Sequence, residues 1–132
     1  MKKILIVHNK YQNIGGEDIA VDNEIEILQK YYEVEVLYFK NDNVLTLKQL
    51  ISFATSNNSD SNNQLKYKIS SFEPDIVYIH NTWFKTSLGI FKILEKLNIK
   101  TFIKLHNFRY ICTSTLSSSK HLDGETLCKA CG

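Results

Sequence analysis

Three of the four histidines in this chain are followed directly by asparagine. The pairs are His8-Asn9, His80-Asn81 and His106-Asn107. Because 12 of the 132 residues are asparagine, composition alone would produce this pattern on the order of a few times in a thousand. Imidazole and amide groups both donate and accept hydrogen bonds, so the pairs indicate a site for a polar ligand. The alternative is that each imidazole only caps a strand end with satisfied hydrogen bonds.

Adjacent glycines, Gly15 and Gly16, precede a segment with helical periodicity. Glycine allows close approach to a ligand, and the free amides at a helix N-terminus attract phosphate. Glu17 and Asp18 follow directly and oppose a phosphate placed too near. The motifs G-x-G-x-x-G and G-x-x-x-x-G-K-[ST] are absent from the sequence, so neither a Rossmann dehydrogenase nor a P-loop nucleoside triphosphatase is supported. The pair indicates either a phosphate-binding turn or a turn that only redirects the chain.

Two further side chains near the histidine pairs could contact a ligand. Trp83, which precedes Phe84, could stack its ring against a sugar or base, or could anchor the following helix in the core. Arg109 could bind an anionic group with two parallel hydrogen bonds, or could be an ordinary surface arginine.

The cysteines form a separate candidate site near the end of the sequence. Cys128 and Cys131 have the spacing of a zinc-binding Cys-x-x-Cys pair, and Cys112 with His121 or His106 would complete four ligands. The sequence contains one such pair, so unbound thiols and a redox pair remain alternatives to structural zinc.

Four strands and at least two helices are expected to position these residues. A continuous apolar run at 3–7 predicts a central strand buried on both faces. Helical spacing of apolar residues predicts one helix over 17–32 with a buried face of Val21, Ile25, Leu28 and Tyr32, and another over 84–97. Further strands are expected at 34–39, 75–79 and 101–105, and shorter helices at 44–53 and 65–72. The polar stretch 56–64 is expected to be a mobile loop.

Strands that alternate with helices predict an α/β fold, a Rossmann-like open parallel sheet with helices on both faces and the strand order two, one, three, four. Ligands of such sheets bind outside the carboxyl ends of the strands. Because His8, His80 and His106 each follow a predicted strand, we expect them to meet at that edge.

Composition limits the class of protein. With 132 residues, 43% hydrophobic and 23% charged, the chain has the size and balance of a single globular domain. A net charge of +2 argues against nucleic acid as the main partner. Without a signal peptide or an apolar run of about 18 residues, and with an odd number of cysteines, the sequence favours the cytoplasm. Lys85, Lys92 and Lys96 could rest on the anionic inner face of a membrane, or could form a solvated helix face.

Four segments, in this order, resemble the amino-terminal half of a family-four glycosyltransferase. They are Ile4–Asn9, Gly15–Glu17, Asp75–Asn81 and Leu105–Arg109. The resemblance covers nearly the whole chain and implies the GT-B fold, in which two Rossmann-like domains face each other across a cleft. Residues 1–132 would then be the first, acceptor-binding domain, and the donor-binding C-terminal domain would be missing.

The resemblance also implies roles for individual residues. Gly15 and Gly16 match a glycine loop that faces the donor diphosphate, and His106 matches the catalytic-site histidine that contacts the donor sugar. The acceptor rim would consist of His80, Asn81, Trp83, Asn107 and Arg109.

The implied reaction is transfer of a sugar from a nucleotide-sugar donor to a glycan or lipid-linked hydroxyl acceptor, with retention, as in polysaccharide biosynthesis. It requires no metal cofactor, because loop amides can stabilise the departing diphosphate. The family's second domain carries two glutamates separated by seven residues, and no such pair occurs here. We therefore expect an excised domain or a truncated gene product that is inactive alone. The rival hypothesis is a non-catalytic glycan- or partner-binding module, with or without stabilising zinc.

Overall fold

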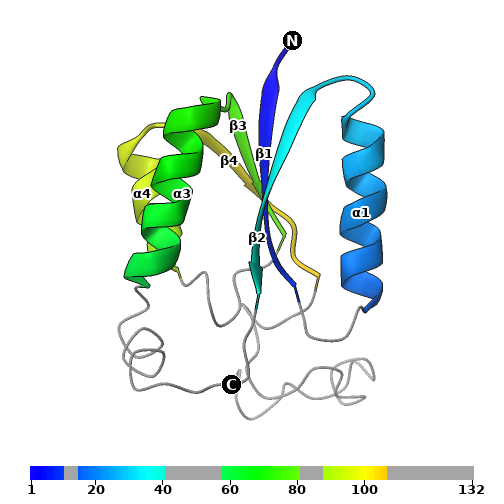
Figure 1. Cartoon of the computed structure of the whole chain (residues 1–132), viewed down its shortest axis with the longest axis horizontal. Coiled ribbons are helices and arrows are strands. Elements are labelled where there is room, and N and C mark those ends of the chain that lie inside the picture. Colours follow the sequence, from blue (N-terminus) through cyan, green and yellow to red (C-terminus); the bar gives the residue numbers. More distant parts are fainter. Residues whose placement is uncertain (11–14, 41–57, 81–87, 107–132) are drawn as a thin grey trace, which may run out of the picture.

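The computed structural model describes residues 1–10, 15–40, 58–80 and 88–106. These residues form an α/β domain with a four-stranded parallel sheet in the order β2-β1-β3-β4. The strands are β1 (Lys3–Lys10), β2 (Glu33–Lys40), β3 (Ile76–Ile79) and β4 (Lys100–Ile103). The helices are α1 (Gly16–Leu28), α3 (Ser59–Phe72) and α4 (Gly89–Lys96). Helix α1 covers one face of the sheet, and α3 and α4 cover the other (Figure 1). The predicted Rossmann-like class and strand order are confirmed.

Strand β1 is the central strand, as its apolar run predicts. It pairs with β2 on one side and β3 on the other, and the residues from Ile4 to Asn9 are buried. The strand extends to Lys10, beyond the predicted end at Val7, because its ladder with β2 continues to the pair Lys10 and Lys40.

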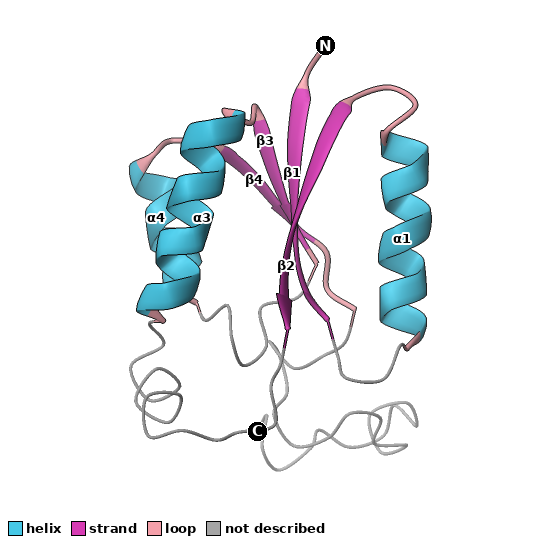
Figure 2. Ribbon diagram, in the orientation of Figure 1, coloured by secondary structure: helices cyan, strands magenta, loops and turns pink. Residues whose placement is uncertain are grey.

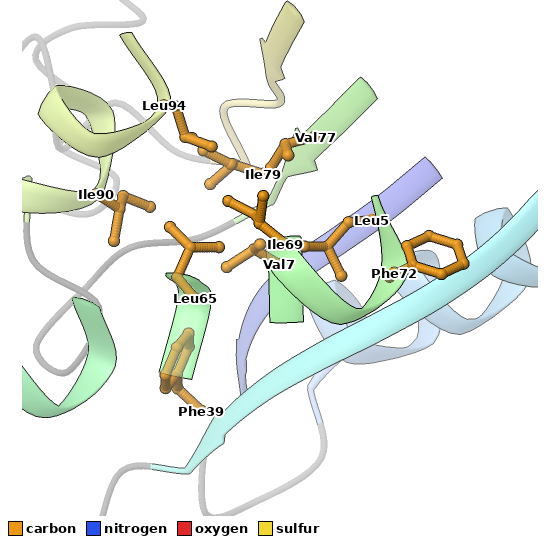
Figure 3. Close-up of a cluster of buried hydrophobic side chains, with 10 residues drawn as sticks. All are labelled: Leu5, Val7, Phe39, Leu65, Ile69, Phe72, Val77, Ile79, Ile90 and Leu94. Carbon is orange, nitrogen blue, oxygen red and sulfur yellow. The ribbon is translucent and has the colours of Figure 1, made fainter. Parts of the chain in front are cut away.

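Alternation along β1 and β3 separates two apolar clusters on the two faces of the sheet. Leu5, Val7, Val77 and Ile79 point toward α3 and α4 and form the larger cluster (Figure 3). The remaining members of that cluster are Phe39, Leu65, Ile69, Phe72, Ile90 and Leu94. On the other face, Ile4 and Ile6 pack against Val21 and Ile25 of α1. Even-numbered residues of β1 and β3 therefore face α1.

Helix α1 carries the predicted buried face. Val21 and Ile25 are buried, and Leu28 and Tyr32 pack partly buried against the same cluster. The helix ends at Leu28, four residues before the predicted end, and the backbone N–H of Tyr32 still donates to the carbonyl of Leu28 at 2.9 Å.

Helix α3 corrects the prediction of a loop over 56–64, because residues from Ser59 onward are helical. Asn58 caps the helix, and its side chain accepts hydrogen bonds from the backbone N–H groups of Asp60 at 3.1 Å and Ser61 at 3.3 Å. Ser61 of the first turn is buried, and its hydroxyl donates to the carbonyl of Asn58 at 3.2 Å. The cap and the buried residues of the later turns therefore hold this polar segment in the helix. The predicted helix over 65–72 is the later part of α3.

Helix α4 buries Ile90, Ile93 and Leu94 and exposes Lys92 and Lys96, as its spacing predicts. The predicted strands at 75–79 and 101–105 are present with bounds shifted by one or two residues. The predicted helix over 44–53 and the start of the helix predicted at 84 lie outside the described residues. Among the helices that are described, none is long and apolar enough to cross a membrane.

Candidate ligand site at the carboxyl edge of the sheet

His8, His80 and His106, here called the histidine cluster, meet near the carboxyl ends of β1, β3 and β4. His80 Nδ1 lies 3.0 Å from His106 Nε2, within hydrogen-bond distance. The rings of His8 and His80 are 6.1 Å apart and nearly perpendicular, at 82°. The predicted convergence of the three imidazoles is therefore present.

Two of the three histidines do not lie directly after a strand, where the sequence predicts all three. His8 lies inside β1, His80 directly follows β3, and His106 follows the last residue of β4 by three positions. Backbone hydrogen bonds continue beyond the short strands, from His80 N–H to Val7 O at 3.0 Å and from Lys104 N–H to Ile79 O at 2.8 Å. These bonds keep the chain in register, so His80 and His106 stay on the face covered by α1.

His8 forms a buried pair with Asp18 in the first turn of α1. His8 Nε2 lies 2.9 Å from Asp18 Oδ1, and His8 is fully buried. Since a carboxylate accepts hydrogen bonds, Nε2–H is the donor of this pair, and the other ring nitrogen is Nδ1. That nitrogen is buried and has no hydrogen-bond partner among the described residues.

Glu24 lies on α1, further along the helix than Asp18, and connects α1 to β3 and to the segment after β4. Its Oε2 accepts a hydrogen bond from the hydroxyl of Tyr78 at 2.9 Å, and its Oε1 pairs with the ammonium of Lys104. Burial alone would raise the pKa of Glu24, but the hydrogen bonds from Lys104 and Tyr78 and the nearby His80 outweigh it and lower that pKa. Burial and the Glu24 carboxylate raise the pKa of Tyr78 to about 12.

His80 and His106 are neutral imidazoles at neutral pH. Burial lowers the pKa of His80 to about 4, against the opposing attraction of Glu24. Burial also lowers the pKa of His106, with Glu17 opposing. His80 Nε2 lies 3.7 Å from Glu24 Oε2, and it has no hydrogen-bond partner within the part of the chain that is described. The two rings therefore act as hydrogen-bonding groups and not as cations.

The glycine pair lies at the start of α1, as predicted, with Gly15 as the N-cap in extended conformation and Gly16 as the first helical residue. The Gly15 N–H donates to Asp18 Oδ2 at 3.0 Å, so an acidic side chain already uses one amide predicted for phosphate. A Cβ placed at either glycine would meet nothing within 4 Å. Neither glycine is required by crowding among the described residues.

The other predicted site residues lie outside the described residues. They are Asn81, Trp83, Asn107 and Arg109 of the predicted rim, and Cys112, Cys128 and Cys131 of the predicted metal site. In residues 1–10, 15–40, 58–80 and 88–106, no group of three histidine, cysteine or acidic side chains is arranged to hold a metal ion.

Sequence reasoning missed Glu24, Tyr78 and Lys104 as members of this site. Two of them could have been found from the alternation of side chains along a strand. Tyr78 precedes His80 by two residues and Lys104 precedes His106 by two, so each pair lies on the same face of the sheet. Glu24 lies between the buried Val21 and Ile25 on the inward face of α1, where a carboxylate needs polar partners.

Two carboxylates, one ammonium and three imidazoles thus surround the carboxyl edge of the sheet. Neutral imidazoles both donate and accept, which suits hydroxyl-bearing ligands, whereas Asp18 opposes an anion near the start of α1. Comparison of the chain with protein families, with curated proteins and with solved structures gave no match.

Proposed function

We propose that this chain is the acceptor-side domain of a retaining glycosyltransferase, a transferase of the family-four type that uses a nucleotide sugar. The observation that carries the proposal is the 3.0 Å contact of His80 with His106 at the carboxyl edge of a parallel sheet, beside buried His8. Ligands of open parallel sheets bind at this edge. The resemblance of the surrounding segments to that family supplies the reaction.

In this reaction a sugar hydroxyl is the group that the domain must orient. Neutral imidazoles suit a hydroxyl, which donates one hydrogen bond and accepts others. His106, half-buried at the rim, would hold the reacting sugar, and His80 would hold His106. The nucleotide would bind a second domain, so we expect no sugar transfer by residues 1–132 alone.

The same proposal places the protein in the cytoplasm, at the inner face of a membrane, where glycan or lipid-linked acceptors are extended. The exposed Lys92 and Lys96 on α4 support contact with anionic lipid, at about 1 kcal/mol for each lysine near the surface. Liposomes with and without anionic lipid test this part, and equal binding to both would remove it.

The second candidate is a non-catalytic glycan-binding module, and Asp18 favours it. Its carboxylate occupies the Gly15 amide at the start of α1 and places negative charge where the enzyme would bind a diphosphate. A module that binds only hydroxyl groups has no need of that anion site.

Histidine-selective ¹⁵N labelling of the chain tests the shared core of both candidates. The probes are the methyl glycosides of glucose, galactose, mannose and N-acetylglucosamine, and separately UDP-glucose and GDP-mannose. We expect at least one glycoside to produce saturable shifts of the His80 and His106 ring resonances. Absence of such shifts with every glycoside would overturn the proposal.

The nucleotide sugars then separate the two candidates. In a uniformly ¹⁵N-labelled sample, saturable shifts of the Gly15 and Gly16 amide resonances with UDP-glucose or GDP-mannose support the enzyme. Glycoside binding without any effect of either nucleotide sugar on those amides counts against a donor contact of the glycine loop in residues 1–132. Joining a donor-binding domain then separates the candidates, because sugar transfer supports the enzyme, whereas glycoside binding with continued inactivity supports the module.

A further inference from the structure

We infer that Glu24 and His80 are positioning residues that fix the tautomer of His106, so that His106 presents its Nδ1 as a hydrogen-bond acceptor. This goes beyond the proposed function by naming how the site holds its ligand. Only the identity of the ligand rests on that function, since the tautomer is a property of the free chain.

The contact between two neutral imidazoles allows two arrangements. With His80 Nδ1 and His106 Nε2 at 3.0 Å, one nitrogen must carry the proton and the other the lone pair. If His80 donates, its Nε2 carries a lone pair and His106 carries its proton on Nδ1. If His106 donates, His80 carries its proton on Nε2, and the lone pair of His106 is on Nδ1.

Glu24 decides between the two arrangements. Its Oε2 lies 3.7 Å from His80 Nε2. The His80 side chain is fully buried beneath α1, and the Glu24 side chain is partly buried. A lone pair on Nε2 would face the negative carboxylate, whereas an N–H would face it with its positive end. The arrangement with the proton on His80 Nε2 is therefore favoured, and His106 becomes the donor.

The Glu24 carboxylate is held in its charged form. Lys104 pairs with one oxygen, and the hydroxyl of Tyr78 donates to the other. Tyr78 also places its ring 4.3 Å from the ring of His80, which restricts rotation of the imidazole. Asp18 is bound to His8 and Gly15 and does not compete for His80. The charge of Glu17 acts on His106, and Glu17 is not among the charges that shift the pKa of His80.

The consequence is a preference for one kind of ligand atom at His106. With its Nε2–H directed at His80, His106 offers a lone pair at Nδ1, which accepts from a hydroxyl or an ammonium and cannot donate to an oxyanion. The hydroxyl of a sugar fits this requirement, and the oxygens of a phosphate do not.

Long-range ¹H–¹⁵N correlation spectra of the histidine-labelled chain at pH 7.5 read the tautomer directly, because protonated and unprotonated ring nitrogens resonate far apart. We expect His106 to carry its proton on Nε2 and His80 on Nε2, each tautomer in about tenfold excess, which needs a preference of about 1.4 kcal/mol. Glu24→Gln removes the charge with little change of shape. In that variant we expect the excess of the Nε2–H tautomer of His106 to be lost.

Two matched variants separate positioning from general stability. Glu26→Gln changes an exposed carboxylate on the same helix, and Lys104→Met breaks the ion pair while leaving the Glu24 carboxylate in place. We expect both to keep the His106 tautomer of the unmodified chain.

A proton on His106 Nδ1 in the unmodified chain would overturn the inference. An unchanged His106 tautomer in Glu24→Gln would overturn the role of Glu24. Loss of the tautomer in Lys104→Met would show that the ion pair, and not the carboxylate alone, positions His106. None of these results depends on a ligand. Failure of every glycoside to bind, with the tautomers as stated, would contradict the proposed function and leave the positioning role intact.

Discussion

The two faces of the central sheet are built for different purposes, although the same strands supply both. Toward α3 and α4, ten buried apolar residues close a continuous core (Figure 3). Helix α1 lies against the other face (Figure 2). On that face four buried apolar residues occupy the start, and the carboxyl end carries His8, His80, Asp18 and Glu24. We infer that one face supplies most of the folding free energy, and the other carries the candidate ligand site.

Helix α1 makes this division clear. Its inward side begins with Asp18, continues through Val21 to Glu24 and Ile25, and so alternates polar and apolar positions. Buried polar groups persist only where they find partners, and here each carboxylate has a histidine of the sheet beside it. The buried polar residues on the α1 face are thus tolerated because the larger apolar cluster on the opposite face stabilises the fold.

The largest effect should follow from a cavity on the α3 and α4 face. Leu65 is fully buried in α3, so Leu65→Ala should lower the free energy of unfolding by about 2–5 kcal/mol. Urea denaturation measures it, with Tyr67→Ala, an exposed change on the same helix, as the control. A loss as small as in the control, or an altered His106 tautomer in folded Leu65→Ala, would contradict the separation of the two faces.

Removing the charge of Asp18 should be the next largest effect. Asp18 accepts from both His8 and the Gly15 N–H, so Asp18→Asn leaves one buried group with a poorer partner and should cost about 1–3 kcal/mol. Asp22→Asn on the same helix, where the carboxylate is exposed, should cost about 0.5 kcal/mol or less. Equal losses in the two variants would show that the buried pair adds nothing.

Acidification should weaken the α1 face specifically. The unfolded chain protonates His80 near pH 6.5, but the folded chain does so only near pH 4, so stability is lost as pH falls through this window. The lowered pKa values of His106 and Glu24 act with the same sign. For each extra proton that the unfolded chain binds, the free energy of unfolding falls by at most about 1.4 kcal/mol per pH unit.

Urea titrations between pH 7 and 4 measure this dependence. Leu65→Ala should shift the whole curve downward and keep its shape, whereas His80→Gln should flatten the part between pH 6.5 and 4. A curve for the unmodified chain that is already flat in this window would remove the neutral buried histidine from the account.

The smallest effect concerns the end of α3. Glu73 has a left-handed φ of 52°, which glycine adopts without strain, so Glu73→Gly should raise the free energy of unfolding by about 0.5 kcal/mol. Asn98, at a φ of 51°, provides the matched control. Asn98→Gly should raise the free energy of unfolding by less, because asparagine tolerates this region. Destabilisation by Glu73→Gly would argue against strain at the end of the helix.

Much of the fold could be predicted because burial leaves periodic patterns in sequence. The apolar run from Ile4 to Val7 indicates a strand covered on both faces, and Val21 and Ile25 indicate the inward side of α1. The first turns of α3 could not be predicted from composition, because a single cap at Asn58 and contacts formed by later turns order a polar segment.

The candidate site was only partly predictable for a different reason. Consecutive His-Asn pairs mark the edge of the sheet, but nothing local to His80 indicates that Glu24 approaches from a helix 56 positions earlier in the chain. That contact depends on the register of β3 against β1 and on the rotation of α1, which tertiary packing decides. The prediction of free amides at Gly15 also overlooked Asp18, whose carboxylate occupies one of them.

The most direct test of the central claim, that the histidine cluster is a ligand site, is His106→Ala measured for stability and binding on one preparation. His106 is half-buried and contributes little core, but its loss leaves a ring nitrogen of buried His80 unpaired, so we expect the free energy of unfolding to fall by about 1–3 kcal/mol. The affinity for the methyl glycoside that shifts the histidine rings should fall about twofold to tenfold, the effect of one hydrogen bond. Unchanged affinity together with a clear loss of stability would show that His106 only caps the sheet, and would contradict the account.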